Sequence, residues 1–183
     1  MRNFLLLLLF FGLLLTACKK EDNPPQPEGP SYMGAATMLL NGEEVTFSPL
    51  LAYNYNSSTK VFLFITEFSP EGREGKSIAF THLPLNKERH VLTRPSLHPQ
   101  EEKSPGASLS GVDGDVLMYY YPLNEQDDID DYIQFTHIDE ETREVKGVFQ
   151  ASFYRDSLPN PDPSLPDSIV IAEGAFETVL QDR

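Results

Sequence analysis

The carboxylates at residues 127–131 come closest, by type and spacing, to a metal site. Asp127, Asp128, Asp130 and Asp131 crowd one short segment. Carboxylate oxygens at this density suit Ca²⁺, which prefers oxygen ligands. The spacing does not match the EF-hand loop, and a solvated acidic loop has the same composition. We therefore expect a solvated loop, with calcium binding by these four aspartates as the alternative.

The four histidines do not form a recognisable metal motif. His82, His90, His98 and His137 are widely separated, and the chain contains no His-Glu-x-x-His segment. His82 and His137 share one context, Phe-Thr-His followed by an aliphatic residue. We interpret this repeat as a strand-end feature used twice. The sequence therefore predicts neither a metal centre nor a cofactor.

Two further patterns could serve hydrolysis. Residues 106–110 approach the nucleophile elbow Gly-x-Ser-x-Gly, but the fifth position is Ser110 and no predicted strand precedes the segment. Glu173 and Glu177 lie on one side of a predicted strand and could form a glycosidase pair, yet an exposed strand face explains them more simply. We expect a protein without enzymatic activity. A cell-envelope hydrolase with an unrecognised site is one alternative, and a structural role in envelope assembly is another.

Tyrosines offer a possible binding surface. Tyr119, Tyr120 and Tyr121 are consecutive, and Tyr53 and Tyr55 form a second, separate pair earlier in the chain. Such rings could stack on a sugar or on a protein partner. In a strand, however, Tyr119 and Tyr121 face one side and Tyr120 the other, so at least one of them is expected in the core. Because the chain has no Trp, core packing is the preferred interpretation.

Cys18 is the only cysteine, so the chain cannot form an internal disulfide. It follows a basic start containing Arg2 and an apolar run at residues 4–15, the arrangement of a secretory signal. A membrane-spanning helix takes about 20 apolar residues, so this run is too short to cross comfortably. An N-terminal membrane anchor is therefore the less favoured reading, and residues 1–17 are predicted as a signal peptide.

Leu15-Thr16-Ala17-Cys18 resembles the lipobox of bacterial lipoproteins. The resemblance implies that the Cys18 thiol receives a diacylglycerol, that residues 1–17 are removed, and that the new amine is acylated. More than one acyl chain is what stable anchoring requires. The membrane is then a partner of this protein through the lipid on Cys18.

The residues after the cysteine carry a second resemblance. Lys19, Lys20, Glu21 and Asp22 are similar to the export signal of Bacteroidetes surface lipoproteins, in which Lys or Gln precedes two acids. The resemblance implies a location on the outer face of the outer membrane. A charged, merely soluble tether is the alternative.

Composition and charge define the rest of the chain. It has 14 basic and 28 acidic residues and a net charge of −14, which opposes binding to nucleic acid. Residues 18–31 are rich in proline and predict an extended tether. Residues 32–183 are long enough for a single domain with its own core.

Strand and turn signals dominate that domain. Asn41-Gly42 predicts a tight hairpin turn, and residues 145–154 alternate between apolar and polar positions, which places Phe149 on the buried face. Residues 94–114 are predicted as a long loop. Ile171 and Phe176 can both face the core only if a bulge occurs at Glu173-Gly174. Strands are expected at 36–40, 43–47, 60–68, 76–83, 89–93, 115–121, 132–138, 145–154 and 168–180.

This pattern predicts an all-β fold, an antiparallel β-sandwich of roughly eight to nine strands. An up-and-down β-barrel, lipocalin-like, is the alternative. The segments Val145–Phe149 and Ile169–Phe176, with Gly-x-Phe in each, are similar to a family of uncharacterised Bacteroidetes surface lipoproteins. The resemblance implies a fold and a location but no reaction. The ligand, an unknown protein or glycan, is left open.

Asp156-Ser157-Leu158 and Asp167-Ser168-Ile169 resemble the Asp-Ser/Thr-apolar signal for O-glycosylation in Bacteroidetes. Both flank a proline-rich segment that is predicted to be an accessible loop. The resemblance implies that Ser157 or Ser168 carries a glycan.

Overall fold

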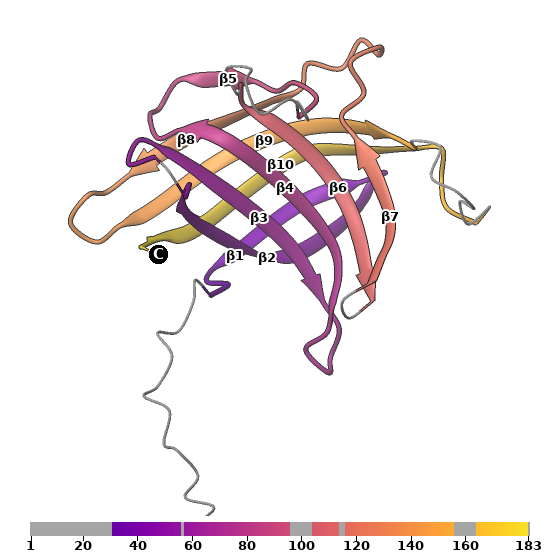
Figure 1. The fold of residues 1–183 in the computed structure, drawn as a ribbon, viewed down its shortest axis with the longest axis horizontal. Coiled ribbons are helices and arrows are strands. Elements are labelled where there is room, and N and C mark those ends of the chain that lie inside the picture. The colour runs from indigo at the N-terminus through magenta and orange to yellow at the C-terminus, as the bar shows by residue number, and fades with distance from the viewer. Residues whose placement is uncertain (1–30, 56, 96–103, 114–115, 156–163, 183) are drawn as a thin grey trace, which may run out of the picture.

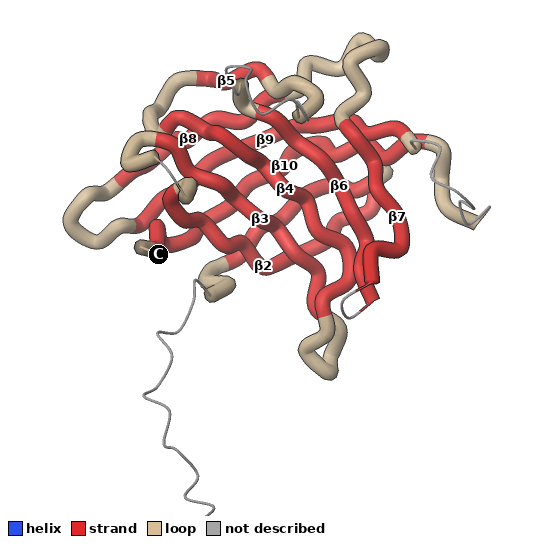
Figure 2. Tube along the Cα trace, viewed as in Figure 1, coloured by secondary structure: helices blue, strands red, loops and turns tan. Residues whose placement is uncertain are grey.

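The structure is a computed structural model, and it contains strands and turns but no helix among the residues it describes (Figure 2). That described part accordingly includes no helix long and apolar enough to cross a membrane. The prediction of an all-β fold is confirmed. The described residues are 31–55, 57–95, 104–113, 116–155 and 164–182.

Ten strands follow one another within the described residues, one more than the nine segments that the sequence indicated. The predicted bounds of residues 60–68 and 132–138 are the observed ones. The strands are β1 (Ala35–Leu40), β2 (Glu43–Tyr53), β3 (Lys60–Phe68), β4 (Glu74–Pro84), β5 (Arg89–Val91), β6 (Gly106–Asp113), β7 (Val116–Pro122), β8 (Tyr132–Ile138), β9 (Glu144–Tyr154) and β10 (Ser168–Gln181).

All ten strands belong to one sheet, in the order β5-β8-β9-β10-β1-β2-β3-β4-β6-β7, with antiparallel neighbours. The sheet is strongly curled into a half-barrel, so that β3, β4 and β6 cross in front of β9 and β10 (Figure 1). The long strand β2 makes the corner: its first part pairs with β1, and its second part pairs with β3. Two separate sandwich sheets are not confirmed, because hydrogen bonds connect the whole set.

The core lies inside this curl. The ring centroids of Phe80 on β4 and Phe149 on β9 are 5.2 Å apart, which joins the two halves of the sheet. The predicted alternation of β9 is confirmed, since Val145, Phe149 and Phe153 are all buried. Burial of such a continuous apolar face is the main stabilising contribution in a domain of this size.

Two Gly-x-Phe segments interlock across β9 and β10. Gly147 pairs with Phe176, and Gly174 pairs with Phe149, so each phenylalanine lies over the other strand's glycine. A Cβ atom at Gly174 would lie 2.6 Å from the Phe149 ring, and one at Gly147 would lie 2.5 Å from the Phe176 ring. Glycine at both positions is therefore a packing requirement.

A bulge in β10 allows residues of opposite parity to face the core. The register of β10 against β9 shifts between Ile171 and Gly174, where Glu173 has a φ of 52°. The predicted bulge is confirmed, and both Ile171 and Phe176 are buried.

Bulges also occur at the two repeated Phe-Thr-His segments. The register of β4 against β3 shifts beside His82, whose φ is 59°, and the register of β8 against β9 shifts between Phe135 and His137. Phe80 and Leu83 are both buried although they are three positions apart, which a regular strand does not allow. The repeat thus marks two bulges rather than two strand ends.

The prediction of a loop over residues 94–114 is wrong for its last part. Strand β6 pairs with β4 on one side and β7 on the other, with Ala107 and Leu109 buried. Its glycines resemble loop composition, but Gly111 is needed because the Tyr119 ring lies over it, 2.1 Å from where a Cβ would stand. Glycine here serves close packing instead of a turn.

The hairpin turn agrees with expectation. Asn41 and Gly42 have φ values of 52° and 85°, as the predicted turn requires. The first described residue, Ser31, donates its N–H to Gln181 Oε1 at 2.7 Å, so this residue lies beside the end of β10. Thr178 Oγ1 donates to the carbonyl of Met33 at 2.7 Å and continues this attachment.

Candidate ligand-binding site

One end of the curled sheet is open and forms a pocket of about 660 Å³. Four segments distant in sequence surround it: the end of β2, the β4–β5 loop, the β8–β9 turn and the end of β10. In Figure 1 these segments lie at the left of the molecule, near the C-terminal label. Volumes of roughly 300–1,000 Å³ are typical of small-molecule sites.

The floor of the pocket is apolar. Val145 and Leu180 are buried members of the core, and Leu85 and Ile138 pack against that core while remaining partly accessible. The strands that carry Val145 and Leu180 turn these side chains inward because both occupy the buried parity of their alternation. An apolar part of a ligand would therefore contact the outer layer of the hydrophobic core.

The rim is charged, and its strongest feature is a bidentate ion pair. Arg143 Nη1 and Nη2 donate to Asp182 Oδ2 and Oδ1 at 2.6 and 2.9 Å. The carbonyl of Arg143 accepts the N–H of Leu180 at 2.9 Å. The backbone of Arg143 adopts the left-handed conformation, with a φ of 64°. The hydrogen bond from Arg143 lowers the pKa of Asp182, and the Asp182 carboxylate raises the pKa of Arg143. The pair stays ionised.

Asp139 shapes the turn beside it. Its Oδ1 accepts the backbone N–H groups of Glu141 and Thr142 at 2.8 and 3.0 Å. These hydrogen bonds, first that from Thr142 and then that from Glu141, lower the pKa of Asp139. Carboxylates that accept backbone N–H groups are held in the charged form. The rim therefore presents fixed charges of both signs, to which Lys87 and Glu140 add.

This arrangement suits binding rather than proton transfer. A general acid or base needs a pKa near the working pH, whereas hydrogen bonds lower the pKa of Asp139 and Asp182 and raise the pKa of Arg143, so all three favour the ionised state. Fixed charges above an apolar floor can orient a ligand that carries both an apolar body and a polar group.

Three of the four predicted calcium ligands, Asp127, Asp130 and Asp131, engage different partners. Asp127 accepts from Asn124 Nδ2 at 2.8 Å and from the N–H of Ile129 at 3.1 Å, and Asp130 pairs with Arg89. Among the described residues there is no group of three His, Cys, Asp or Glu side chains that could hold a metal. Calcium binding here stays a prediction to which this geometry adds no support.

Asp131 differs from its neighbours because it is only 7 % exposed. Its Oδ1 accepts the N–H of Ser152 at 2.7 Å, at the point where β9 passes beyond the start of β8. Burial raises the pKa of Asp131 to about 6, against the opposing hydrogen bond from Ser152. Ser152, expected on the outer face of its strand, is buried, because this acidic segment covers it. The role visible in this geometry is to complete the edge of β9.

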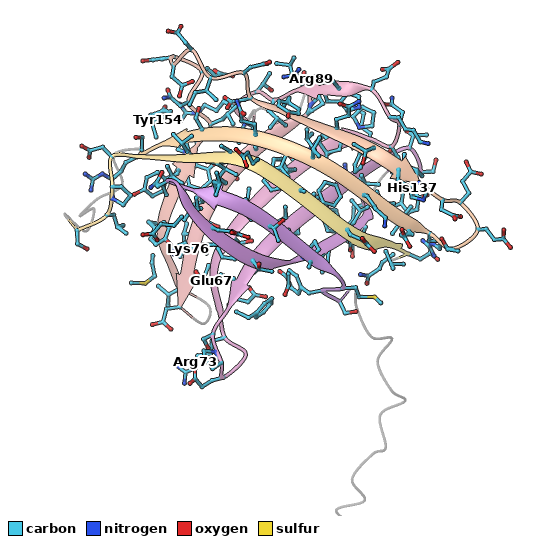
Figure 3. The ribbon with its side chains drawn as sticks, turned by 180° about the vertical axis from the view of Figure 1, so that it is seen from behind. Glu67, Arg73, Lys76, Arg89, His137 and Tyr154 are labelled. Atoms are coloured by element: carbon cyan, nitrogen blue, oxygen red, sulfur yellow. The ribbon has the colours of Figure 1, made fainter. Side chains whose placement is uncertain are left out.

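The histidines are scattered over the fold. His82 occupies the β4 bulge, and His137 lies at the end of β8 (Figure 3). His90 Nε2 lies 2.9 Å from Asn86 Oδ1, and burial lowers the pKa of this imidazole. His98 lies outside the described residues. The structure thus brings none of the described histidines together at one site.

The serines and glutamates considered for hydrolysis lie on different strands, β6 and β10. Ser108 and Ser110 alternate with the buried residues of β6 and lie on its outer face. Glu173 and Glu177 are exposed, and Glu177 accepts from Lys146 Nζ at 3.0 Å. The expectation of an exposed strand face for the two glutamates is confirmed.

The tyrosines divide as the parity argument predicts. Tyr121 is buried, and its hydroxyl donates to the carbonyl of Pro166 at 2.7 Å. Tyr119 packs against Tyr121 with ring centroids 5.7 Å apart. Tyr53 lines the pocket, while Tyr55 is 88 % exposed. The five rings do not form one platform.

The predicted modification sites are mostly beyond the described part. Residues 1–17, Cys18, the export signal Lys19–Asp22 and Ser157 all lie outside it. Ser168 is exposed at the start of β10, next to Asp167, whose carboxylate pairs with Arg155. Glycosylation of Ser168 stays a prediction.

Sequence reasoning missed the pocket residues. Lys87, Arg143 and Asp182 follow no shared motif, and only their position just beyond strand ends could have suggested them. Comparison with known proteins adds no name to this site: no protein-family model, no curated protein and no solved structure matches the chain.

Proposed function

We propose that this protein is a lipoprotein of the outer membrane, anchored through Cys18 and facing the cell exterior, whose β-domain binds a ligand without transforming it. The observation that carries the binding proposal is the open pocket, with its apolar floor and its rim of fixed charges. Its ligand is a small amphiphile, with an apolar body against Val145 and Leu180 and a polar group at Arg143 and Lys87.

The anchor follows from the order of segments along the chain. Cys18 precedes a proline-rich stretch, and within the described residues Ser31 already bonds Gln181 at the end of β10. The buried apolar residues of that described part run from Ala36 to Leu180. An extended proline-rich segment between Cys18 and such a core would hold the domain away from the membrane. As part of this proposal, the two halves of the single curled sheet pack against each other as the two layers of a β-sandwich.

The charged groups of the rim support binding without catalysis. Arg143 is held by Asp182, and Asp139 is held by two backbone N–H groups. Groups committed in this way can orient a ligand by charge, but they exchange protons poorly at neutral pH.

The binding proposal is tested by filling the pocket. Ile138, partly buried in its wall, is replaced by Trp in the unlipidated mature chain. Val91→Trp on β5 serves as the matched control, because Val91 is exposed and pairs with Tyr132 at the opposite end of β8 from Ile138. A panel of fatty acids, N-acyl amino acids and disaccharides is screened by thermal shift and followed by calorimetry. Ligands that stabilise the wild type and Val91→Trp but not Ile138→Trp support the pocket. Ligands that bind all three chains equally would refute it.

A further inference from the structure

Strand β7 is an exposed apolar edge. It is the last strand of the sheet and pairs only with β6, and its sequence, VLMYYYP, contains no charged residue. Val116, Leu117 and Met118 are 59, 55 and 59 % exposed, so three of the most exposed large hydrophobic side chains of the described chain are consecutive. Figure 1 shows this strand at the right-hand border of the molecule.

The edge is free at one end only. Beyond β7, Leu123 forms an antiparallel bridge with Phe153, which brings that end against β9. The other end, at Val116–Met118, lies beside Val112 and Asp113 of β6, away from this bridge. Edge strands usually carry charges, proline or strong bulges that prevent pairing with other chains.

The opposite edge shows such protection. Strand β5 is only three residues long, and its Arg89 pairs with Asp130 and lies 3.8 Å over the ring of Tyr132. On β7 such protection is limited to a bulge at Met118 and to Pro122 at the far end, and the strand carries no charge. The β5 edge is therefore short and charged, whereas the β7 edge presents uncharged apolar residues at 116–118.

The surroundings of this free end are acidic. A pocket of about 430 Å³ at the β3–β4 turn is lined by Glu67, Glu71, Glu74 and Asp113, against which Arg73 supplies one positive charge. Asp113 pairs in register with Val116, so the pocket adjoins the exposed strand. Lys76 pairs with Glu67 at 3.3 Å, and Figure 3 shows Glu67, Lys76 and Arg73 at the same end of the molecule. Burial and, after it, the Glu67 charge raise the pKa of Tyr119, which places Glu67 near β7.

We propose that β7 is a docking edge for an extended, cationic and apolar segment of a partner protein, which pairs with β7 as an additional strand. Main-chain hydrogen bonds to the free edge would supply affinity, and apolar side chains of the segment would cover Val116, Leu117 and Met118. Lys or Arg residues of the segment would face Glu67, Glu74 and Asp113. Charge selects this occupant over a second copy, since each copy has a net charge of −14.

The test uses a peptide of alternating Lys and Val, labelled with fluorescein, and its Glu-Val counterpart. Binding to the mature chain, with Cys18→Ser to prevent lipidation, is followed by fluorescence anisotropy at low and high salt. We expect the Lys-Val peptide to bind and the Glu-Val peptide to bind about tenfold more weakly or not at all. Affinity for the Lys-Val peptide should fall with added salt.

Variants locate the site. Leu117→Lys should weaken binding about tenfold because it places a like charge on the free edge. Val91→Lys, at a side chain that is 65 % exposed on the other edge strand, should leave binding unchanged. Both changes lie at exposed positions, so unchanged unfolding midpoints would show that folding is intact.

Three results would overturn the proposal. Equal binding of both peptides would remove the charge argument. Equal affinities of Leu117→Lys and Val91→Lys would place the peptide elsewhere. A concentration-dependent dimer in sedimentation, abolished by Leu117→Lys, would make a second copy the occupant of β7. None of these results bears on the open pocket, whose proposal stands or falls on its own test.

Discussion

Phe149 and Gly174 should behave as one energetic unit. Phe149 is 1 % exposed, faces Gly174 across the β9–β10 pair, and contacts Phe80 and Phe176 with ring centroids 5.2 and 6.4 Å away. Truncating a buried Phe to Ala typically costs about 3–5 kcal/mol. A domain of this kind has a total stability of only about 5–15 kcal/mol. Phe149→Ala should therefore lower the unfolding midpoint strongly, while Gln150→Ala beside it should do little.

Gly174→Ala should destabilise the domain by overpacking, whereas Phe149→Ala destabilises it by leaving a cavity. The three atoms nearest to the added Cβ all belong to the Phe149 ring, at 2.6 and 2.7 Å. Overpacking of this kind costs about 1–3 kcal/mol. In a Phe149→Ala background the ring is gone, and the same substitution should cost little or even fill part of the cavity. Coupling between contacting residues is commonly about 0.5–3 kcal/mol, and here it should be favourable.

Urea unfolding followed by circular dichroism measures all four members of this cycle. Gly147→Ala with Phe176→Ala is the matched control, because a Cβ at Gly147 meets the Phe176 ring at 2.5 Å but also the backbone oxygen of Gln134 at 2.7 Å. Removing the ring cannot relieve the second clash, so this pair should show less rescue. Strict additivity for Phe149 and Gly174 would refute the packing described for the two Gly-x-Phe segments.

Three further predictions concern pH and location. Burial raises the pKa of Asp131 to about 6 from 3.8; the stability this shift contributes is full below pH 3.8 and is lost as pH rises through 6. Urea titrations should show a loss of stability on the order of 3 kcal/mol between pH 3.8 and about 6. Asp131→Asn should remove most of this pH dependence, so an unchanged dependence in that variant would exclude Asp131 as its source. Cys18→Ala should leave an uncut, unlipidated precursor that labelled palmitate does not mark; normal labelling would end the lipoprotein proposal. Replacing Lys19–Asp22 with alanines should protect the protein from protease added to intact cells, and equal digestion of both forms would contradict the export signal.

Regular alternation is what made most strands predictable. Residues 60–68 and 132–138 were bounded correctly because buried apolar side chains alternate with less buried ones over most of each strand, Val61, Leu63 and Ile65 in the first and Ile133 and Phe135 in the second. The bulge at Glu173 was also predictable, since Ile171 and Phe176 have opposite parity and neither can be left in water. These features depend only on neighbouring residues, which the sequence displays directly.

Features that depend on distant residues were not predictable in this way. Gly111 reads as part of a loop until Tyr119 is known to lie over it, and that contact exists only after β6 and β7 pair. The pocket collects Lys87, Arg143 and Asp182 from separate segments, and it forms because the end of β10 meets β2 at Leu180 and Leu51. One sequence read by itself carries no signal for such closure.

The two proposed binding surfaces belong to different parts of the same curl. The pocket lies at the left of Figure 1, where β10 meets β2, and the docking edge lies at the right, where β7 leaves β9. A single sheet in which every strand is held by its neighbours transmits little change between such places unless the core repacks. Leu117→Lys should therefore leave ligand binding at the pocket unchanged, and Ile138→Trp should leave binding of the Lys-Val peptide unchanged. If either variant altered the other surface, the curl of the sheet would have to differ between the bound and free protein, and the half-barrel would then couple its two ends.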